Sequence, residues 1–255
     1  MTTVCFSTFC HPPHLSKLHA PGVLDEIIAS HQFSFDEAIV VHQRCLGLSY
    51  RPFNDPAIRI VESEDYYPQI YDRFRIDLNN PISARDCHGP GAAHWWAWHT
   101  LNHLIVLEEA RSDYIVFSDC DTLIINSDPA KSWIQEAIEI LETYPEVHIV
   151  SPGEGGSMAE AKLPDDQARL TRNVSQQLFI TECKRFKQTD FDIPWNWEFL
   201  APGGPMAEYY HMLEGRIWRY LHKHQLWRAI LPDKWRYWHY NPWEPKGWLE
   251  SGKIW

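Results

Sequence analysis

The chain is organised around the stretch Tyr114-Ile115-Val116-Phe117-Ser118-Asp119-Cys120-Asp121-Thr122-Leu123-Ile124-Ile125. An apolar run ends in two carboxylates one residue apart, and a second apolar run follows. A short continuous apolar run predicts a strand buried on both faces. Because carboxylates are rarely buried without a partner, we expect this strand to deliver Asp119 and Asp121 into a crevice at its carboxyl end. Two oxygen ligands at this spacing suit Mg²⁺ or Mn²⁺.

Length and charge narrow the class of protein. The chain has 255 residues, of which 44% are hydrophobic, so it can bury a substantial core. Its formal charge is −11, which disfavours general binding to nucleic acids because phosphate contacts need clustered Lys and Arg. The acidic balance remains compatible with a small anionic substrate held through a divalent cation.

Cysteine usage and hydropathy bear on the compartment. The six cysteines form no CxxC pair, which favours reduced thiols and a cytoplasmic location. The first residues lack a basic segment followed by a long apolar one, and no apolar run reaches 18 residues. We therefore expect no transmembrane segment, with peripheral association with a membrane left open.

Three early segments repeat one pattern, in which an apolar strand ends in polar residues. They are Thr3–Phe9, Glu37–His42 and Ile58–Val61. Together with Tyr114–Ser118 they predict an α/β protein with a mixed, mainly parallel central sheet flanked by helices. We find no internal repeat and no linker that would split the chain, so we expect a single domain.

Helical patterns and loops fill the intervals between the strands. His88-Gly89-Pro90-Gly91 opens a long helix over Ala92–Arg111, and its glycines are compatible either with an anion site or with a plain turn. Asp128-Pro129 predicts the start of a helix that runs to Leu141. Residues 151–174 are predicted to form either a mobile lid or a disordered surface loop.

The second half of the chain is richer in aromatic residues. Val147–Val150 predicts a short strand, Gln176–Glu182 is compatible with strand or helix, and Met206–His222 predicts a helix. The segment Trp227–Trp255 is aromatic and broken by prolines, so we expect it to lie over the domain. Nine of the 13 tryptophans lie at or after Trp195, where they could form a packed core or platforms for sugar rings.

These residues resemble the nucleotide-sugar-dependent glycosyltransferases of the GT-A fold. Asp119-Cys120-Asp121 after a buried strand is similar to their DxD motif, and Gly203-Gly204 before a helix is similar to an acceptor-side segment of many members. The resemblance implies a single GT-A-like, Rossmann-like domain. It divides into a nucleotide-sugar-binding half (1–125), an acceptor-side half (126–240) and a C-terminal tail (241–255).

The resemblance implies a metal-dependent transfer of a sugar from a nucleoside-diphosphate sugar to a hydroxyl of a glycan or glycoconjugate. Asp121 would coordinate Mn²⁺ or Mg²⁺ directly, and Asp119 would bind the ribose or the metal. Cys120 would be the variable middle residue of the motif, beside the donor. His239 is the candidate for a third ligand, with a packed or surface histidine as the alternative.

The same resemblance assigns the donor and acceptor contacts. The candidates for donor contacts at the strand ends and on the long helix are Thr8, His42, Glu64, Asp65 and His94. The candidates for acceptor contacts are Trp195, Trp197, Gly203 and Gly204.

An inverting enzyme needs a carboxylate to deprotonate the acceptor hydroxyl, and inversion is favoured here. Glu208 is the first candidate for this base, with Asp190, Asp192 and Glu198 as alternatives. Arg216 and Arg219 could assist an anionic acceptor, although a solvated surface position is the expected one.

Two other functions use the same residues differently. A nucleotidyltransferase or phosphotransferase would also use a carboxylate–metal site, but the first strand is followed by no Walker-type loop. A non-catalytic carbohydrate-binding protein would use the tryptophans alone. The donor sugar, the nucleotide and the acceptor stay open at this stage.

Overall fold

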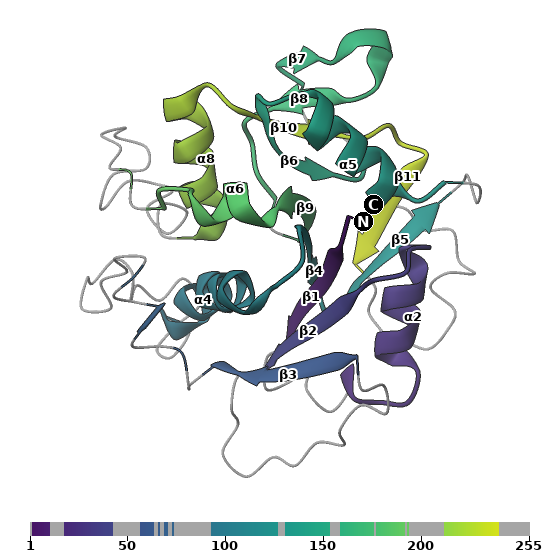
Figure 1. The fold of residues 1–255 in the computed structure, drawn as a ribbon, viewed down its shortest axis with the longest axis vertical. Coiled ribbons are helices and arrows are strands. Elements are labelled where there is room, and N and C mark those ends of the chain that lie inside the picture. Colours follow the sequence, from purple (N-terminus) through teal and green to yellow (C-terminus); the bar gives the residue numbers. More distant parts are fainter. Residues whose placement is uncertain are drawn as a thin grey trace.

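A computed structural model describes residues 2–10, 18–42, 57–63, 66, 69–70, 73, 93–126, 131–153, 159–175, 177–191, 193 and 212–239. For Cys10, residues 93–99, Asn126, Trp238 and His239 it describes the backbone alone. Within these residues the chain forms an α/β fold in which helices cover both faces of a central sheet (Figure 1).

The central sheet has nine strands in the order β3-β2-β1-β4-β9-β6-β10-β8-β7 among the described residues. Their bounds are β1 Val4–Cys10, β2 Glu37–His42, β3 Ile58–Glu62, β4 Tyr114–Asp119, β6 Val147–Ser151, β7 Ala161–Lys162, β8 Arg169–Thr171, β9 Leu178–Glu182 and β10 Trp227–Ile230. Four pairings are parallel and four are antiparallel. The sheet is therefore mixed and mainly parallel, as expected. Because β9 runs antiparallel to both β4 and β6, these two strands point the same way, and among the nine described strands only β9 and β8 run in the opposite direction.

A second sheet and the helices complete the layers. β5 (Thr122–Asn126) pairs antiparallel with β11 (Trp235–His239). The helices are α2 Val23–Ser30, α4 Ala93–Glu109, α5 Trp133–Thr143, α6 Cys183–Lys187 and α8 Leu213–His224, with a short 3₁₀ turn over Pro164–Asp166.

Alternating side chains of the strands feed two apolar clusters, one on each face of the sheet. On the face of α4, α6 and α8, Phe117 of β4 packs beside Phe179 of β9 and Phe186 of α6, and Figure 1 shows these three helices on one side. On the other face, Val116 and Ile180 pack in one cluster with side chains of α2, α5 and the β5–β11 ribbon. The period of two in β4 thus sends Asp119 towards the first of these faces.

Two predicted helix starts are wrong. α5 begins at Trp133 rather than after Asp128, because Ser132 caps it: the Ser132 side chain accepts from the Ile134 N–H, and Gln135 completes a capping box. Asp128 and Pro129 lie outside the described residues. α8 begins at Leu213 rather than at Met206, because Met212 has extended backbone angles.

The described part of the segment 151–174 is regular structure and not the disordered loop that was one expectation, whereas the lid stays a prediction. Residues 159–174 include β7 and β8, which pair at the edge of the sheet, and Gly153 forms a bridge with Arg236. The Glu160 carboxylate accepts hydrogen bonds from the Arg172 N–H, at 2.7 Å, and from the Thr171 hydroxyl. These bonds close the β7–β8 hairpin, whereas residues 154–158 lie outside the described part of the chain.

The aromatic C-terminal segment is also more integrated than expected. β10 is an interior strand that pairs parallel with β6, and β11 pairs with β5. Residues 240–255 are outside the described residues. The segment Gln176–Glu182 was compatible with strand or helix, and its residues Leu178–Glu182 form strand β9.

Membrane and surface features are simple. No described helix combines the length and the apolar character that crossing a bilayer requires.

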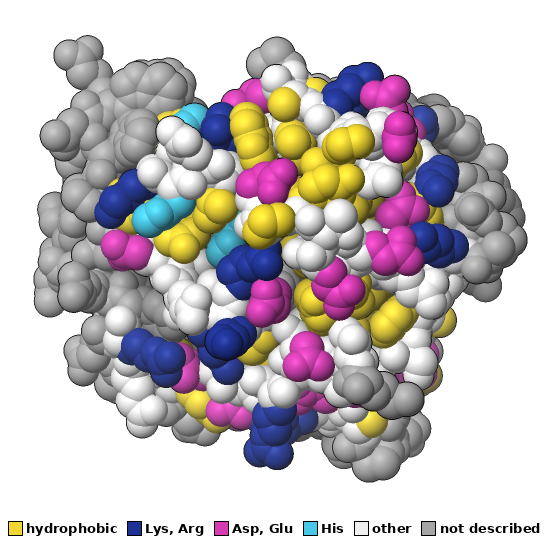
Figure 2. All heavy atoms as spheres, turned by 45° about the horizontal axis from the view of Figure 1, so that its top comes forward, with side chains coloured by type: hydrophobic (Ala, Val, Ile, Leu, Met, Phe, Trp, Pro, Cys, Tyr) yellow, Lys and Arg dark blue, Asp and Glu magenta, His cyan; other side chains and the backbone are white. Residues whose placement is uncertain are grey.

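On the described part of the face in Figure 2, basic and acidic side chains are interspersed, so that face carries no continuous basic stripe of the kind nucleic acids need.

Candidate donor and metal site

Strand order locates the crevice of the sheet. β1 lies between β2 and β4 and is parallel to both, so the chain progresses outward from β1 in two opposite directions. Ligands of open α/β sheets bind outside the carboxyl ends of the strands at such a switch point. The carboxyl ends here bring Phe9 opposite Asp119 and Thr8 opposite Ser118. This physical rule places Asp119 at the expected crevice.

Asp119 has an unusual electrostatic environment. It is the last residue of β4 and only partly exposed, and its Oδ1 atom is buried without a hydrogen-bond partner among the described residues. Burial raises the pKa of its carboxyl well above the ordinary value, and the charges of Asp121 and Glu214 raise it further. A buried carboxylate oxygen that lacks a donor calls for a cation or a proton.

The backbone around Asp119 is held firmly. Its N–H donates to the Gln177 carbonyl at 2.8 Å, across from the start of β9. Asp121 follows in the turn between β4 and β5 and is partly exposed. Between them, Cys120 is 5% exposed, and its side chain packs in the apolar cluster on the α2 and α5 face.

The β5–β11 ribbon brings a distant residue beside the two aspartates. His239 pairs in register with Thr122, which directly follows Asp121. The backbone of His239 therefore lies next to the turn that carries both carboxylates, although its side chain is outside the described residues. Thr122 is fully buried, and its hydroxyl makes no hydrogen bond to any described residue.

The two carboxylates at the end of β4 have the chemistry of ligands for a divalent metal. Hard carboxylate oxygens are the ligands that Mg²⁺ and Mn²⁺ prefer, and the unpartnered Oδ1 of Asp119 would gain from a cation. Within the described part of the chain, no group of three or more His, Cys, Asp and Glu side chains could hold a metal by itself. Asp119 and Asp121 thus fit a metal that takes further ligands from His239 or from substrate phosphates.

The predicted donor residues on the first strands are both buried. Thr8 of β1 is 1% exposed, and its hydroxyl has no hydrogen-bond partner among the described residues. His42, at the end of β2, is fully buried, and its Nε2 lies 2.9 Å from Nε2 of His19. Burial, reinforced by His19, lowers the pKa of His42 to about 3, so the ring is neutral at pH 7. A nucleotide sugar that contacted Nε2 of His42 would have to displace His19.

Several predicted residues lie outside the described part of the chain. For His94 on α4 the backbone is described but not the side chain. The others are Glu64, Asp65, Asp192, Trp195, Trp197, Glu198, Gly203, Gly204 and Glu208. These assignments stay predictions. Asp190 is described and exposed, and its charge raises the pKa of Tyr220, with burial as the larger cause.

Glu214 is a residue that the sequence reasoning missed. It lies in the first turn of α8, is partly buried, and its charge acts on Asp119. The sequence predicted a helix from Met206, whereas α8 begins at Leu213. The extended angles of Met212 place Glu214 in the first turn of α8, and Glu208 lies outside the described residues.

The two arginines of α8 were expected at the surface and are instead buried. Arg216 is 4% exposed and donates to the Phe191 carbonyl at 2.9 Å, and Arg219 is 1% exposed. Arg216 therefore ties α8 to the chain that precedes it, which leaves a structural role as the observed one.

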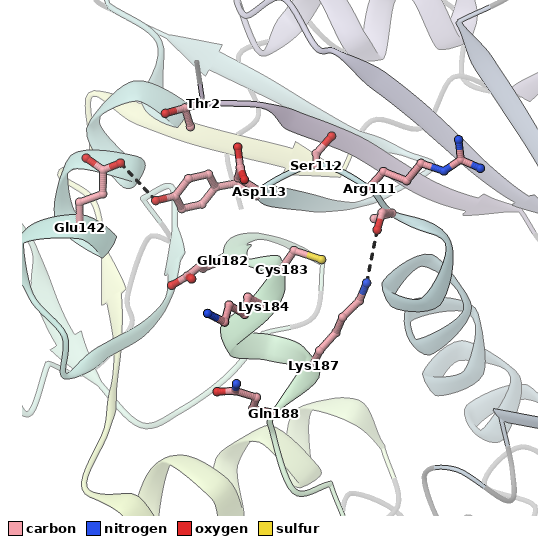
Figure 3. A pocket seen from close by; sticks show the side chains of 12 residues that line it. Thr2, Arg111, Ser112, Asp113, Glu142, Glu182, Cys183, Lys184, Lys187 and Gln188 are labelled. Atoms are coloured by element: carbon pink, nitrogen blue, oxygen red, sulfur yellow. Dashed lines mark hydrogen bonds between the residues drawn. The ribbon is translucent and has the colours of Figure 1, made fainter.

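A cavity of about 660 Å³ lies at the opposite edge of the sheet (Figure 3). Its lining includes Tyr114 at the start of β4 and Cys183 and Lys187 of α6. Tyr114 and Asp119 are five residues apart on one strand, which corresponds to about 17 Å. The Lys187 ammonium donates to the Ala110 carbonyl at 3.4 Å across this cavity. The cavity is therefore separate from the end of β4 that carries Asp119.

Comparison with known proteins finds distant structural similarity. No family model and no curated protein matches the sequence. The matching solved structures include a mycobacterial protein (TM-score 0.42, 16% identity, 97% of this chain and 70% of that one). They also include galactosyltransferase LgtC in complex with donor and acceptor sugar analogues (TM-score 0.37, 13% identity, 72% and 59%).

A further similar structure is glucosyl-3-phosphoglycerate synthase from Mycobacterium tuberculosis in complex with Mn²⁺, UDP and glucosyl-3-phosphoglycerate (TM-score 0.34, 17% identity, 72% and 57%). The chain thus spans less than two thirds of the length of the two glycosyl-transferring enzymes. At these scores the similarities assign neither a family nor an activity to this chain.

Proposed function

We propose that this chain is a metal-dependent glycosyltransferase that moves a sugar from a nucleoside-diphosphate sugar to a hydroxyl of a glycan or glycoconjugate. The observation that carries the proposal is Asp119 at the switch point of the sheet. Its buried Oδ1 has no hydrogen-bond partner in the part of the chain that the structure describes, and two further carboxylates, Asp121 and Glu214, act on it. Such a cluster of negative charge is stabilised when a divalent cation and its phosphate ligands occupy the crevice.

In this proposal Asp119 and Asp121 hold Mn²⁺ or Mg²⁺, and His239, placed beside Thr122, is the candidate third ligand. The bound metal would neutralise the charge that develops on the departing nucleoside diphosphate. The hydrogen bond from Asp119 N–H to the Gln177 carbonyl fixes the backbone at the end of β4. The backbone that carries the carboxylate therefore needs little reordering when ligand binds.

Glu214 is the described candidate for the base of an inverting reaction. It reaches the region of Asp119 from α8, on the acceptor half of the chain, and would accept the proton of the acceptor hydroxyl. Glu208 remains the sequence-based alternative. Comparing Glu214→Gln with Glu208→Gln decides between them, because only the variant that lacks the base loses turnover while it keeps donor binding.

The test is a thermal-shift panel of nucleotide sugars and nucleoside diphosphates, with Mn²⁺, with Mg²⁺ and with a chelator. A ligand at about 100 times its Kd stabilises a protein by about 2.7 kcal/mol, which corresponds to a rise in Tm of about 5–10 °C for this chain length. We expect such a shift only when the metal and the nucleotide are both present.

Matched variants locate the site. Asp121→Asn should abolish the metal-dependent shift, whereas Asp25→Asn, an exposed aspartate on α2, should leave it intact. A metal-dependent shift that survives Asp121→Asn would show that the nucleotide binds elsewhere. Release of pyrophosphate from a nucleoside triphosphate would favour a nucleotidyltransferase, and metal-independent glycan binding would favour a carbohydrate-binding protein.

A further inference from the structure

Gln177 lies where three elements of the proposed site meet. It directly precedes β9, and its carbonyl accepts the N–H of Asp119 at the end of β4. Its side-chain Oε1 accepts the hydroxyl of Tyr237 on β11 at 3.1 Å. One residue thus connects the strand that carries the first aspartate to the ribbon that carries His239.

The bond to Tyr237 also fixes which way the amide faces. A glutamine amide has one acceptor oxygen and one nitrogen with two N–H donors. When a phenol hydroxyl occupies the oxygen, the nitrogen, which lies in the same amide plane, points away from that hydroxyl. The Nε2 atom makes no hydrogen bond within the described part of the chain, and the residue is only partly buried. The amide therefore presents two oriented donors without a protein acceptor.

We propose that Gln177 is a positioning and binding residue of the donor site, which the sequence analysis did not identify. Its carbonyl orients Asp119, and its amide nitrogen donates a hydrogen bond to an oxygen of the nucleoside-diphosphate ligand. Tyr237 acts through Gln177 by holding the amide in the orientation that faces the ligand. This inference rests on the proposed function, because it names a second contact of the same ligand.

The test measures the Kd of Mn²⁺ and a nucleoside diphosphate by calorimetry, with the tightest binder among UDP, GDP, CDP and ADP. A hydrogen bond to a charged oxygen is worth about tenfold or more in affinity. We expect Gln177→Ala to raise the Kd about tenfold. Gln177→Glu keeps the acceptor for Tyr237, removes the donors and adds a negative charge beside Asp119, so it should raise the Kd further.

A double-mutant cycle separates this role from a general structural one. Tyr237→Phe should weaken binding several-fold in the wild-type background and clearly less in the Gln177→Ala background, because the hydrogen bond that orients the amide is lost only in the first case. Gln188→Ala, an exposed glutamine near the opposite edge of the sheet, is the matched control and should bind as the wild type does.

Three results overturn the inference. The wild type binds the nucleotide but both Gln177 variants bind it within twofold, or Tyr237→Phe weakens binding equally in both backgrounds. In either case the proposed function survives and the role of Gln177 does not. If the wild type binds no nucleoside diphosphate with Mn²⁺, both fail together. Should Gln177→Ala not fold, the nearly isosteric Gln177→Glu carries the same comparison.

Discussion

Acid sensitivity is the property of this fold whose magnitude follows most directly from the structure. His31 follows α2, is 1% exposed, and packs edge-on against Phe6 and Phe35. Its Nδ1 accepts the indole N–H of Trp133 at 3.1 Å, so the neutral ring carries its proton on Nε2. Protonation would charge a buried ring and would turn Nδ1 into a donor that faces another donor. Burial accordingly lowers the pKa of His31 from 6.5 to about 3.

The sign and size of the effect follow from linkage. Between about pH 3 and pH 6.5 the unfolded chain binds a proton at His31 that the folded chain does not bind, so stability falls as the pH falls. The slope approaches about 1.4 kcal/mol per pH unit, and the loss reaches about 2 kcal/mol at pH 5. Burial also lowers the pKa of His42 and His148 to about 3. Together the three rings would cost about 6 kcal/mol at pH 5, against a typical stability of about 5–15 kcal/mol.

The assay is urea unfolding of the wild type and His31→Asn at intervals from pH 7.5 to pH 5. The asparagine oxygen can still accept the Trp133 indole N–H, and a loss common to every pH cancels from the slope. We expect the variant to lose about 1.4 kcal/mol per pH unit of the wild-type dependence below pH 6. Gln188→Asn, at an exposed position directly after α6, is the control and should leave the slope unchanged because it removes no titratable group. Equal slopes for wild type and His31→Asn would refute the reasoning, because they would mean that the folded protein protonates this ring freely.

The remaining predictions concern three local contacts. Ser132→Ala removes the cap of α5 and the hydroxyl that donates to the His31 carbonyl at 2.8 Å, so denaturant unfolding should show a loss of about 1–2 kcal/mol, with Ser34→Ala as an exposed control. Gly153→Ala would place a Cβ 2.8 Å from the Trp235 carbonyl and 3.0 Å from the Asp233 Cα, so backbone must move and stability should fall by about 1–3 kcal/mol; an unchanged Tm would show that the β6–β11 contact yields easily. Glu160→Gln weakens the bonds that close the β7–β8 hairpin, so limited proteolysis between residues 159 and 172 should accelerate, and an unchanged cleavage rate would contradict the role given to Glu160.

Local pattern predicted the elements whose character depends on near neighbours in the chain. Glu37–His42 is a strand with the predicted bounds, and the apolar run from Tyr114 ends at Asp119 as expected. A short continuous apolar run is typical of a strand that is buried on both faces. A carboxylate is rarely buried, so it marks the residue at which such a strand ends. Before α5 the prediction was wrong: the sequence pattern favoured Asp128-Pro129 as the start of the helix, whereas Ser132 is its N-cap.

Some residues of the candidate site could be identified from the sequence, and others only from the structure. Asp119 and Asp121 were identified from the sequence because their position after the strand is a local property. Glu214, Gln177 and the register of His239 beside Thr122 depend on segments that are about 60 to 120 residues away along the chain. Nothing within a short window specifies these approaches.

The amino-acid sequence by itself thus determined the α/β class, the four parallel strands from β3 to β4 and the pair of carboxylates at the end of the last one. Only the tertiary structure decided that β9 enters the sheet antiparallel, that β10 lies inside it, and that β11 closes against β5. The physical reason is that the apolar pattern of a strand or helix is set by residues that are close together in the sequence. Strand pairing and the burial of a charge depend instead on which distant segments pack against each other and exclude water.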